Sequence, residues 1–182
     1  MLTKTEMTKT SKLVITAMTM CLIMVAIFVL RVPIPFTQGY INLSDAIIFM
    51  GVLILGYKYG AVAAGVGSMM GDIIGGFAMW APWTFVIKGV MAIIVGLILE
   101  AFAKKEITDK QFFAVKIFAM AMAGFFMVAG YYVAEGIMYG NWIVAALGIP
   151  WNIGQFAVGI VLAMALSSAL AKTSFKKYLF LQ

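Results

Sequence analysis

The sequence contains no histidine and a single cysteine, Cys21, among its 182 residues. The absence of histidine argues against a zinc site or a histidine general base, and a lone thiol excludes an internal disulfide framework. Charged residues make up 11% of the chain and hydrophobic residues 64%, whereas a soluble domain is about a quarter charged and half apolar. The composition therefore predicts an integral membrane protein.

Six apolar segments are candidates to cross a bilayer, which needs about 20 mostly apolar residues. They cover residues 12–31, 43–57, 59–78, 83–103, 112–135 and 150–171. The second is short and the third is rich in glycine, so both depend on packing against their neighbours. Asn42 and Ser44 are suited to cap the second helix, and Pro82 and Pro150 fit the first turns of the fourth and sixth. We expect an all-α membrane protein, a bundle of six transmembrane helices that forms one domain over residues 1–182.

The basic residues predict the orientation of this bundle. If six helices alternate across the membrane, the lysines fall on one side, namely Lys4, Lys9, Lys12, Lys58, Lys104, Lys105, Lys110, Lys116, Lys172, Lys176 and Lys177. The other side has Arg31 at its edge. Cytoplasmic loops carry the excess of Lys and Arg, so both termini are predicted to be cytoplasmic. The net charge of +6 is then explained by orientation in a bilayer rather than by binding of nucleic acid.

Ionisable residues inside the apolar segments point to a binding site, because a charge in hydrocarbon costs several kcal/mol unless it is paired or faces a wet cavity. Asp45, Asp72, Lys88 and Glu135 all fall toward the outer side in the six-helix topology, where polar and aromatic residues accompany them. We expect a substrate pocket there, since small-molecule sites combine aromatic walls with a few convergent polar groups. The candidate substrate-binding residues are Gln38, Tyr40, Asp72, Trp80, Thr84, Lys88, Tyr131, Glu135, Tyr139, Asn152 and Gln155.

Each of these residues also has a purely structural interpretation. Asp45 could cap its helix together with Asn42, and Asp72 could form an ion pair with Lys88. Glu135 could be a solvated helix end, and the Trp and Tyr residues could form an interfacial belt. Small residues spaced by four, such as Gly67, Gly71 and Gly75, favour close helix packing. The convergence of the charged residues favours a site.

The chain resembles a substrate-binding S component of an energy-coupling factor (ECF) vitamin transporter, of the riboflavin/pyridoxine/hydroxymethylpyrimidine branch. The resemblance is strongest in YINLSDAIIFMGVLILGYKYGAVAAGVGSMMGDIIGG and in WAPWTFVIKGVMAIIVGLI, which contains A-P-x-T-x-x-x-K-G. It implies a six-helix bundle with a vitamin bound near the outer face. It also implies that Ala17 and Cys21, which match a small-residue face of the first helix, dock a transmembrane scaffold protein.

This resemblance implies a non-enzymatic vitamin-capture subunit in the plasma membrane of a bacterium. The chain carries no P-loop motif and needs no cofactor of its own, so ATP would be used by two partner ATPases. Hydroxymethylpyrimidine or pyridoxine is the expected substrate. The alternative is a self-sufficient proton-coupled secondary transporter, in which Asp72, Lys88 and Glu135 carry protons; the two halves show no paired inverted repeat, which argues against it. An intramembrane enzyme is disfavoured because no nucleophile is paired with a base and no metal-ligand cluster is present.

Overall fold

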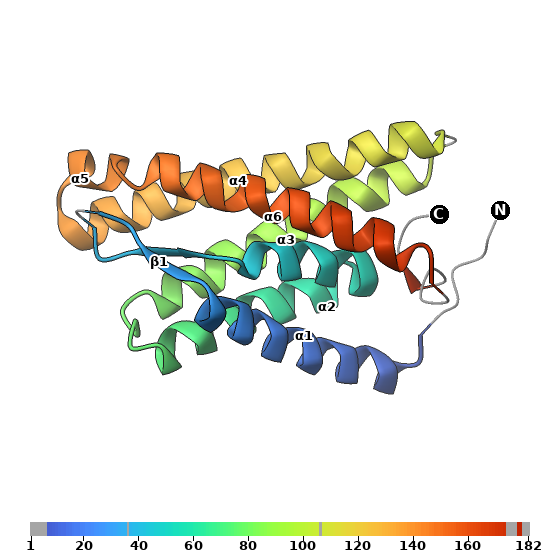
Figure 1. Cartoon of the computed structure of the whole chain (residues 1–182), viewed down its shortest axis with the longest axis horizontal. Helices are drawn as coiled ribbons and strands as arrows, with labels where there is room; N and C mark the ends of the chain where they lie inside the picture. Colours follow the sequence, from blue (N-terminus) through green and yellow to red (C-terminus); the bar gives the residue numbers. More distant parts are fainter. Residues whose placement is uncertain (1–6, 36, 106, 174–177, 180–182) are drawn as a thin grey trace.

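Helices dominate the computed structural model, which describes residues 7–35, 37–105, 107–173 and 178–179. The elements follow in the order α1 (Lys9–Val29), β1 (Arg31–Pro33), β2 (Tyr40–Asn42), α2 (Ser44–Ile74), α3 (Ala81–Ala103), α4 (Asp109–Tyr139), α5 (Trp142–Ala146) and α6 (Ile149–Leu170) (Figure 1). Among the described residues, five helical segments are long and apolar enough to span a membrane, with α5 and α6 forming one of them. The predicted class, an all-α membrane protein, is confirmed.

Local sequence signals account for several helix ends. Thr108 and Gln111 form a capping box at the start of α4. Gly140 ends that helix in the left-handed conformation, with φ 61°. Pro82 and Pro150 lie in the first turns of α3 and α6, as expected. The antiparallel hairpin of β1 and β2, in which Val32 pairs with Ile41, was not predicted, nor was the short helix α5.

Helix α2 is broken at Gly56, which has φ 77° and ψ 177°. In a continuous helix Val52 and Gly60 would be separated by about 12 Å along the axis. Here a methyl group added to Gly60 would lie 3.2 Å from the Cα atom of Val52. The chain therefore folds back at Gly56, and the two arms of α2 (residues 44–55 and 57–74) pack against each other. The expected break near residue 58 is present, two residues earlier.

The first arm of α2 begins inside the bundle rather than at its end. The hairpin leads the chain from one end of the molecule to the middle, where α2 starts (Figure 1). Ser44 and Asp45 in the first turn are completely buried. At about 1.5 Å per residue the arm is about 18 Å long, shorter than a hydrocarbon core of about 30 Å. Asp45 therefore lies at the end of its helix, as expected, but this end lies in the middle of the bundle (Figure 1).

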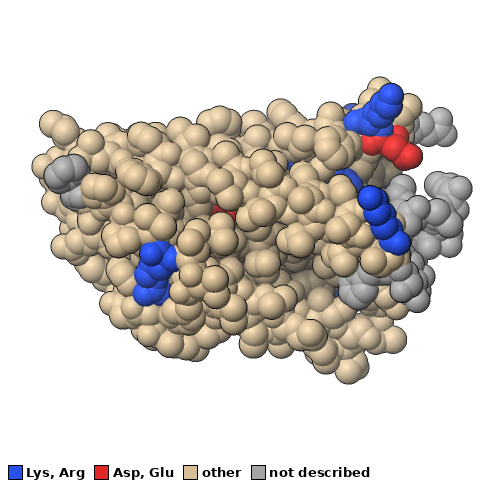
Figure 2. All heavy atoms as spheres, in the orientation of Figure 1, with Lys and Arg blue, Asp and Glu red and all other residues tan. Residues whose placement is uncertain are grey.

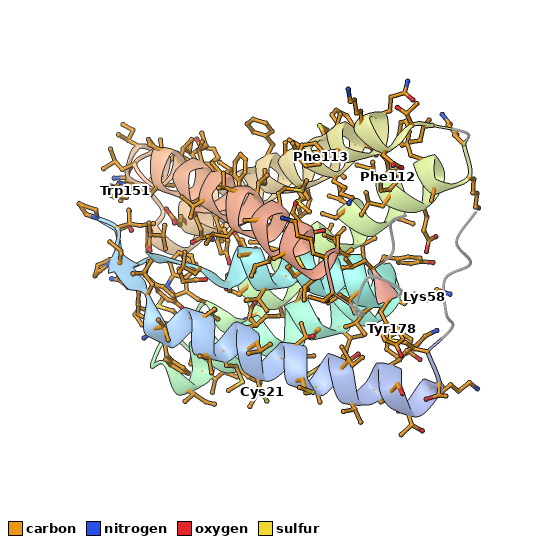
Figure 3. All side chains as sticks on the ribbon, turned by 45° about the vertical axis from the view of Figure 1, so that its right-hand side comes forward. Cys21, Lys58, Phe112, Phe113, Trp151 and Tyr178 are labelled. Atoms are coloured by element: carbon orange, nitrogen blue, oxygen red, sulfur yellow. The ribbon has the colours of Figure 1, made fainter. Side chains whose placement is uncertain are left out.

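Glycines let α1 pack closely on the second arm of α2. A methyl group on Gly67 would lie 3.0 Å from the Cα atom of Met20, and one on Gly71 would lie 2.6 Å from a methyl of Ile27. This confirms the close packing expected for the glycine-rich segment. Ala17 and Cys21 are exposed on the other face of α1, and Cys21 points away from the bundle (Figure 3).

Basic residues gather at one end of the molecule. Figure 2 shows Lys and Arg atoms clustered at that end of the visible face, with a separate basic group near the other end and an almost uncharged surface between them. Lys58 lies near Tyr178 at the end of the bundle opposite Trp151 (Figure 3). Lys4, Lys176 and Lys177, which also supported the orientation, lie outside the described residues.

The close contact of the two α2 arms predicts that Gly60 tolerates no side chain. Ala is a better helix former than Gly by about 1 kcal/mol, and at Gly154, where an added methyl meets open space, Gly154→Ala should preserve or raise the melting temperature. Gly60→Ala should lower it, because the new methyl would meet Val52. The measurement is thermal unfolding of both variants in detergent. Equal melting temperatures would contradict the folded-back arrangement of α2.

Candidate functional site

A small cavity of about 30 Å³ lies between the hairpin and helices α1, α2, α3, α4 and α6. It is lined by Ile27, Ile34, Gly39, Tyr40, Asn42, Ser44, Ser68, Asp72, Trp80, Thr84, Lys88, Tyr131, Glu135, Asn152 and Gln155. A water molecule needs about 10–15 Å³ of such space, so the cavity has room for about two. A larger ligand therefore requires the lining side chains or the hairpin to move outward.

Nine of the eleven predicted site residues line this cavity. The two exceptions are Gln38, whose side chain is exposed, and Tyr139. Both lie close to the site: the backbone N–H of Gln38 donates a hydrogen bond of 3.1 Å to the Tyr139 hydroxyl, which ties the hairpin to the end of α4. The structure thus brings the predicted residues together, and their binding of a substrate stays a prediction.

Asp45 is the centre of the polar contacts beneath the cavity. Lys88 donates a hydrogen bond to Asp45 Oδ1 and forms a buried ion pair with it. Gln155 Nε2 donates to Asp45 Oδ2 at 2.9 Å. Three helices, α2, α3 and α6, therefore meet at one carboxylate. The carboxylate also lies in the first turn of α2, where negative charge is favoured by the helix dipole.

This arrangement differs from two of the structural alternatives. An ion pair of Lys88 with Asp72 was one alternative, but the ion-pair partner of Lys88 is Asp45, because α2 begins deep enough to place Asp45 beside α3. Capping of α2 by Asp45 together with Asn42 was the other. Instead, Asn42 Oδ1 accepts a hydrogen bond of 2.8 Å from the Ser44 N–H, while Ser44, a second predicted cap, makes no side-chain capping bond.

Contacts around the ion pair hold its members in place. The Asn42 N–H donates to Gln155 Oε1 at 2.9 Å, so Gln155 bridges the hairpin and Asp45. The Met127 sulfur accepts a hydrogen bond from Lys88 Nζ at 2.9 Å. A methyl group on Gly159 would lie 2.8 Å from the Cβ atom of Asp45, so a glycine is needed for α6 to approach α2 this closely. Gly159 is therefore an internal packing position.

Asp72 is connected through Tyr40 to Arg31 at the start of the hairpin. The Tyr40 hydroxyl donates a hydrogen bond to Asp72 Oδ1. The Arg31 guanidinium lies 4.6 Å from the centre of the Tyr40 ring and 4.9 Å from that of Phe77, and its Nη1 donates to the Gly75 carbonyl at 3.2 Å. Burial, together with the nearby Asp72 carboxylate, raises the pKa of the Tyr40 hydroxyl. Tyr40 therefore stays protonated and able to donate at physiological pH.

An aromatic wall borders the cavity on the side of α3 and α4. The Trp80 ring lies 6.2 Å, centre to centre, from both Tyr131 and Tyr139, and the Tyr131 hydroxyl lies 3.4 Å from that of Thr84. Trp80 is buried, so it is not part of an interfacial belt. Trp142 at the start of α5 and Trp151 in the first turn of α6 are, by contrast, exposed, as an aromatic belt requires.

Several buried polar atoms on the cavity wall have no hydrogen-bond partner among the described residues. They are Ser44 Oγ, Ser68 Oγ, Asp72 Oδ2, Trp80 Nε1 and Glu135 Oε2. Glu135 is 2% exposed, so it is not a solvated helix end. Buried polar groups are nearly always satisfied, and an unsatisfied one costs about 1–3 kcal/mol. The cavity therefore presents both donors and acceptors to a polar ligand.

Sequence reasoning missed part of this lining. Asp45 was recognised as a buried charge but was not included among the site residues, and Asn42 and Ser44 were interpreted as caps. Ser68 lies in the glycine-rich stretch of α2, where a serine is typical of close helix packing, so no signal marked it. Gly39 lies between Gln38 and Tyr40, which were both predicted as site residues, but a glycine has no side chain to suggest a role.

The ion pair predicts a specific pattern of stability. Lys88→Met keeps most of the volume but leaves Asp45 buried without its cation, which should cost about 3–5 kcal/mol of unfolding free energy. Adding Asp45→Asn removes the stranded charge and keeps an acceptor for Gln155, so the double variant should be more stable than Lys88→Met alone. Thermal unfolding of the variants tests this. A double variant no more stable than Lys88→Met would show that the pair does not couple the helices.

Comparison with known proteins places this geometry in a family. A family model for the S component of the ECF-type riboflavin transporter matches residues 7–172. The thiamine precursor transporter HmpT of Lactococcus lactis subsp. cremoris (strain MG1363) is 30% identical over 142 residues, which are 78% of this chain and 76% of the relative. A protein of Pyrococcus woesei, described as an uncharacterized protein in a gap 3'region, is 34% identical over 116 residues, 64% of this chain and 72% of the relative.

The fold has a counterpart among solved structures. A structure described as the S component of a bacterial ECF transporter superposes with a TM-score of 0.68 at 21% identity, over 90% of this chain and 97% of the other. At this identity the likeness concerns the fold. The match of the family model over most of the chain shows the family. The chain belongs to the S components of ECF-type riboflavin transporters, a family of membrane transport proteins and not of enzymes.

Proposed function

We propose that this S component captures a small vitamin precursor, hydroxymethylpyrimidine or pyridoxine, in the cavity beneath the hairpin. The observation that carries the proposal is the set of unpartnered polar atoms on an aromatic-walled cavity. A single heteroaromatic ring with hydroxyl and amino groups can supply hydrogen bonds to these atoms and stack on the aromatic side chains. The relative named as a thiamine precursor transporter supports hydroxymethylpyrimidine, the pyrimidine part of thiamine.

Riboflavin is the second candidate, because the matching family model is described by that vitamin. Its three fused rings and ribityl chain need far more room than a single ring. A cavity of about 30 Å³ must expand for either ligand, and it must expand less for the smaller one. Competition between the two ligands for the purified protein separates these candidates.

We also propose that the chain crosses the membrane six times, with both termini in the cytoplasm and the cavity toward the outside. Two observations support this topology. The chain folds back at Gly56, so α2 contributes two arms, and Lys58 beside that turn lies at the end of the bundle opposite Trp151 (Figure 3). The start of α1 and the end of α6 share the Lys58 end (Figure 1), which the positive-inside rule assigns to the cytoplasm.

Cysteine labelling in intact cells tests the topology. In a Cys21→Ala background, a cysteine replacing Gly140 should react with a membrane-impermeant maleimide from outside. A cysteine replacing Lys105 should react only after the membrane is opened, since it lies at the basic end. The reverse pattern would overturn the proposed orientation, and labelling of both positions from the same side would overturn the six-span count.

We propose that partner proteins supply the energy for uptake. They are a transmembrane scaffold and two ATPases, and ATP is used by the ATPases and not by this chain. The chain carries no P-loop motif. The inner half of α3 is apolar over Val90–Leu99, and Met91, Ala92 and Val95 are fully buried there. A conduction path needs a polar lining through both halves, so this packing supports capture with delivery by partners over the proton-coupled alternative. The proposed location is the plasma membrane of a bacterial cell.

Docking is proposed to use the exposed small residues Ala17 and Cys21 of α1. In proteoliposomes with ATP inside, the wild-type protein with scaffold and ATPases should accumulate labelled hydroxymethylpyrimidine, whereas the protein alone should bind it without accumulation. Ala17→Trp should abolish accumulation and keep binding, because the ring separates two closely packed helices. A matched Val158→Trp change, on an exposed face of α6, should leave both intact. Accumulation driven by a proton gradient without partners would overturn the proposal.

A further inference from the structure

We infer that Glu135, together with Asp72, makes this site selective for the charge of its substrate. The site takes a flat heterocycle that bears an amino or cationic group, and it rejects the same heterocycle when it carries a phosphate or carboxylate. This inference rests on the proposed function and narrows its substrate class. It assigns Glu135 as the specificity-determining residue, and it follows from how the charges of the cavity are paired.

The one lysine on the cavity wall is already engaged. Lys88 is 1% exposed, forms its ion pair with Asp45, and donates a further hydrogen bond to the Met127 sulfur. Arg31 is not among the lining residues. Its guanidinium is held over the Tyr40 and Phe77 rings, where Nη1 donates to the Gly75 carbonyl, while Nε and Nη2 have no hydrogen-bond partner among the described residues. A cation that is free to receive an anionic ligand is therefore absent from the described lining.

The two carboxylates of the cavity wall, unlike Lys88, lack an ion-pair partner among the described residues. Asp72 Oδ2 and Glu135 Oε2 are buried and have no hydrogen-bond partner among the described residues. Within that part of the chain, neither carboxylate forms an ion pair with a lysine or arginine. Asp72 does receive the Tyr40 hydroxyl on its other oxygen, so Glu135 is the less compensated of the two. Each free oxygen is an acceptor that an N–H or O–H group of a ligand can satisfy.

The Glu135 carboxylate lies against two glycines, of which Gly148 leaves it the room that it needs. A methyl group on Gly148 would lie 2.9 Å from Glu135 Oε2, and one on Gly39 would lie 3.5 Å from Oε1. Gly148 is in the turn before α6, and Gly39 is at the tip of the hairpin. The carboxylate thus sits where the hairpin and the turn between α5 and α6 close over the cavity. A ligand that enters between these two segments meets Glu135.

The aromatic neighbours favour the same kind of ligand. Trp80, Tyr131 and Tyr40 all line the cavity with Glu135. Aromatic faces beside a carboxylate attract a cation through both the ring quadrupoles and the charge. Trp80 Nε1 is an unpartnered donor, which suits a ring nitrogen with a lone pair. An aminated aromatic ring offers N–H donors, a lone-pair acceptor and a flat face, so it complements all three features.

Exclusion of anions follows from the same charges. A phosphate brought near Asp72 and Glu135 repels both carboxylates, and it loses its hydration without gaining a free cation. Discrimination of this kind is achieved by placing an unfavourable group against the wrong ligand. The site is therefore expected to separate a vitamin precursor from its phosphorylated form by charge, in addition to size.

The test is a set of binding titrations on the purified full-length protein. The ligand pairs are hydroxymethylpyrimidine with its phosphate ester, and pyridoxine with pyridoxine 5'-phosphate. The wild type should bind the unphosphorylated member of at least one pair, and at least about 100-fold tighter than its phosphate. Glu135→Gln keeps the size of the side chain but removes its charge, so it should reduce this ratio at least tenfold. Glu135→Asp keeps the charge and should retain most of the ratio.

Glu100→Gln is the matched control. Glu100 lies near the C-terminal end of α3 and outside the cavity lining, whereas the lining residues of α3, Thr84 and Lys88, lie nearer its N-terminal end. It should leave both affinities unchanged. A phosphate ester that binds as tightly as its parent compound would overturn the inference. An unchanged ratio of the two affinities in Glu135→Gln would overturn it as well. In both cases, tight binding of the unphosphorylated compound would leave the proposed function standing. A folded wild-type protein that binds none of the four ligands would overturn both.

Discussion

The buried ion pair between Asp45 and Lys88 is the constraint on which the rest of the structure depends. It exists because the hairpin leads the chain into the middle of the bundle, so that α2 starts there with a carboxylate in its first turn. The pair joins α2 to α3, and Gln155 extends the network to α6 and the hairpin. Because the one lysine of the cavity wall is paired with Asp45, the carboxyl groups of Asp72 and Glu135 have no cation partner among the described residues and are available to a ligand.

Stability and function compete in this site. Five unpartnered polar atoms on the cavity wall cost unfolding free energy, at about 1–3 kcal/mol for each that stays unsatisfied. A purely structural core would replace them with apolar side chains. Their presence is consistent with a site whose hydrogen bonds are completed by substrate, and the small volume of the cavity implies that the hairpin or its neighbours move to admit it. A ligand that completes these bonds should stabilise the closed bundle.

Much of the fold and of the lining could be predicted from the sequence. Segment lengths and lysine placement indicated the helices, and ionisable residues in apolar segments indicated the cavity, because few other reasons exist to keep a charge in hydrocarbon. The partner of Lys88 could not be predicted, since it depends on how deep α2 begins. That depth is set by the hairpin of β1 and β2, three residues per strand, which is too short to leave a clear alternating pattern. Ser68 could not be distinguished from a packing residue for a similar reason.

The central claim is that the cavity between Asp72 and Glu135 holds a small aminated vitamin precursor. The most direct measurement is mass spectrometry of the small molecules that the purified protein retains after expression in cells that make or take up vitamins. The account predicts a compound with an aromatic ring, an amino group or other cationic centre, and no phosphate or carboxylate, present at close to one per chain. Retention of a phosphorylated or acidic compound at that ratio would contradict it.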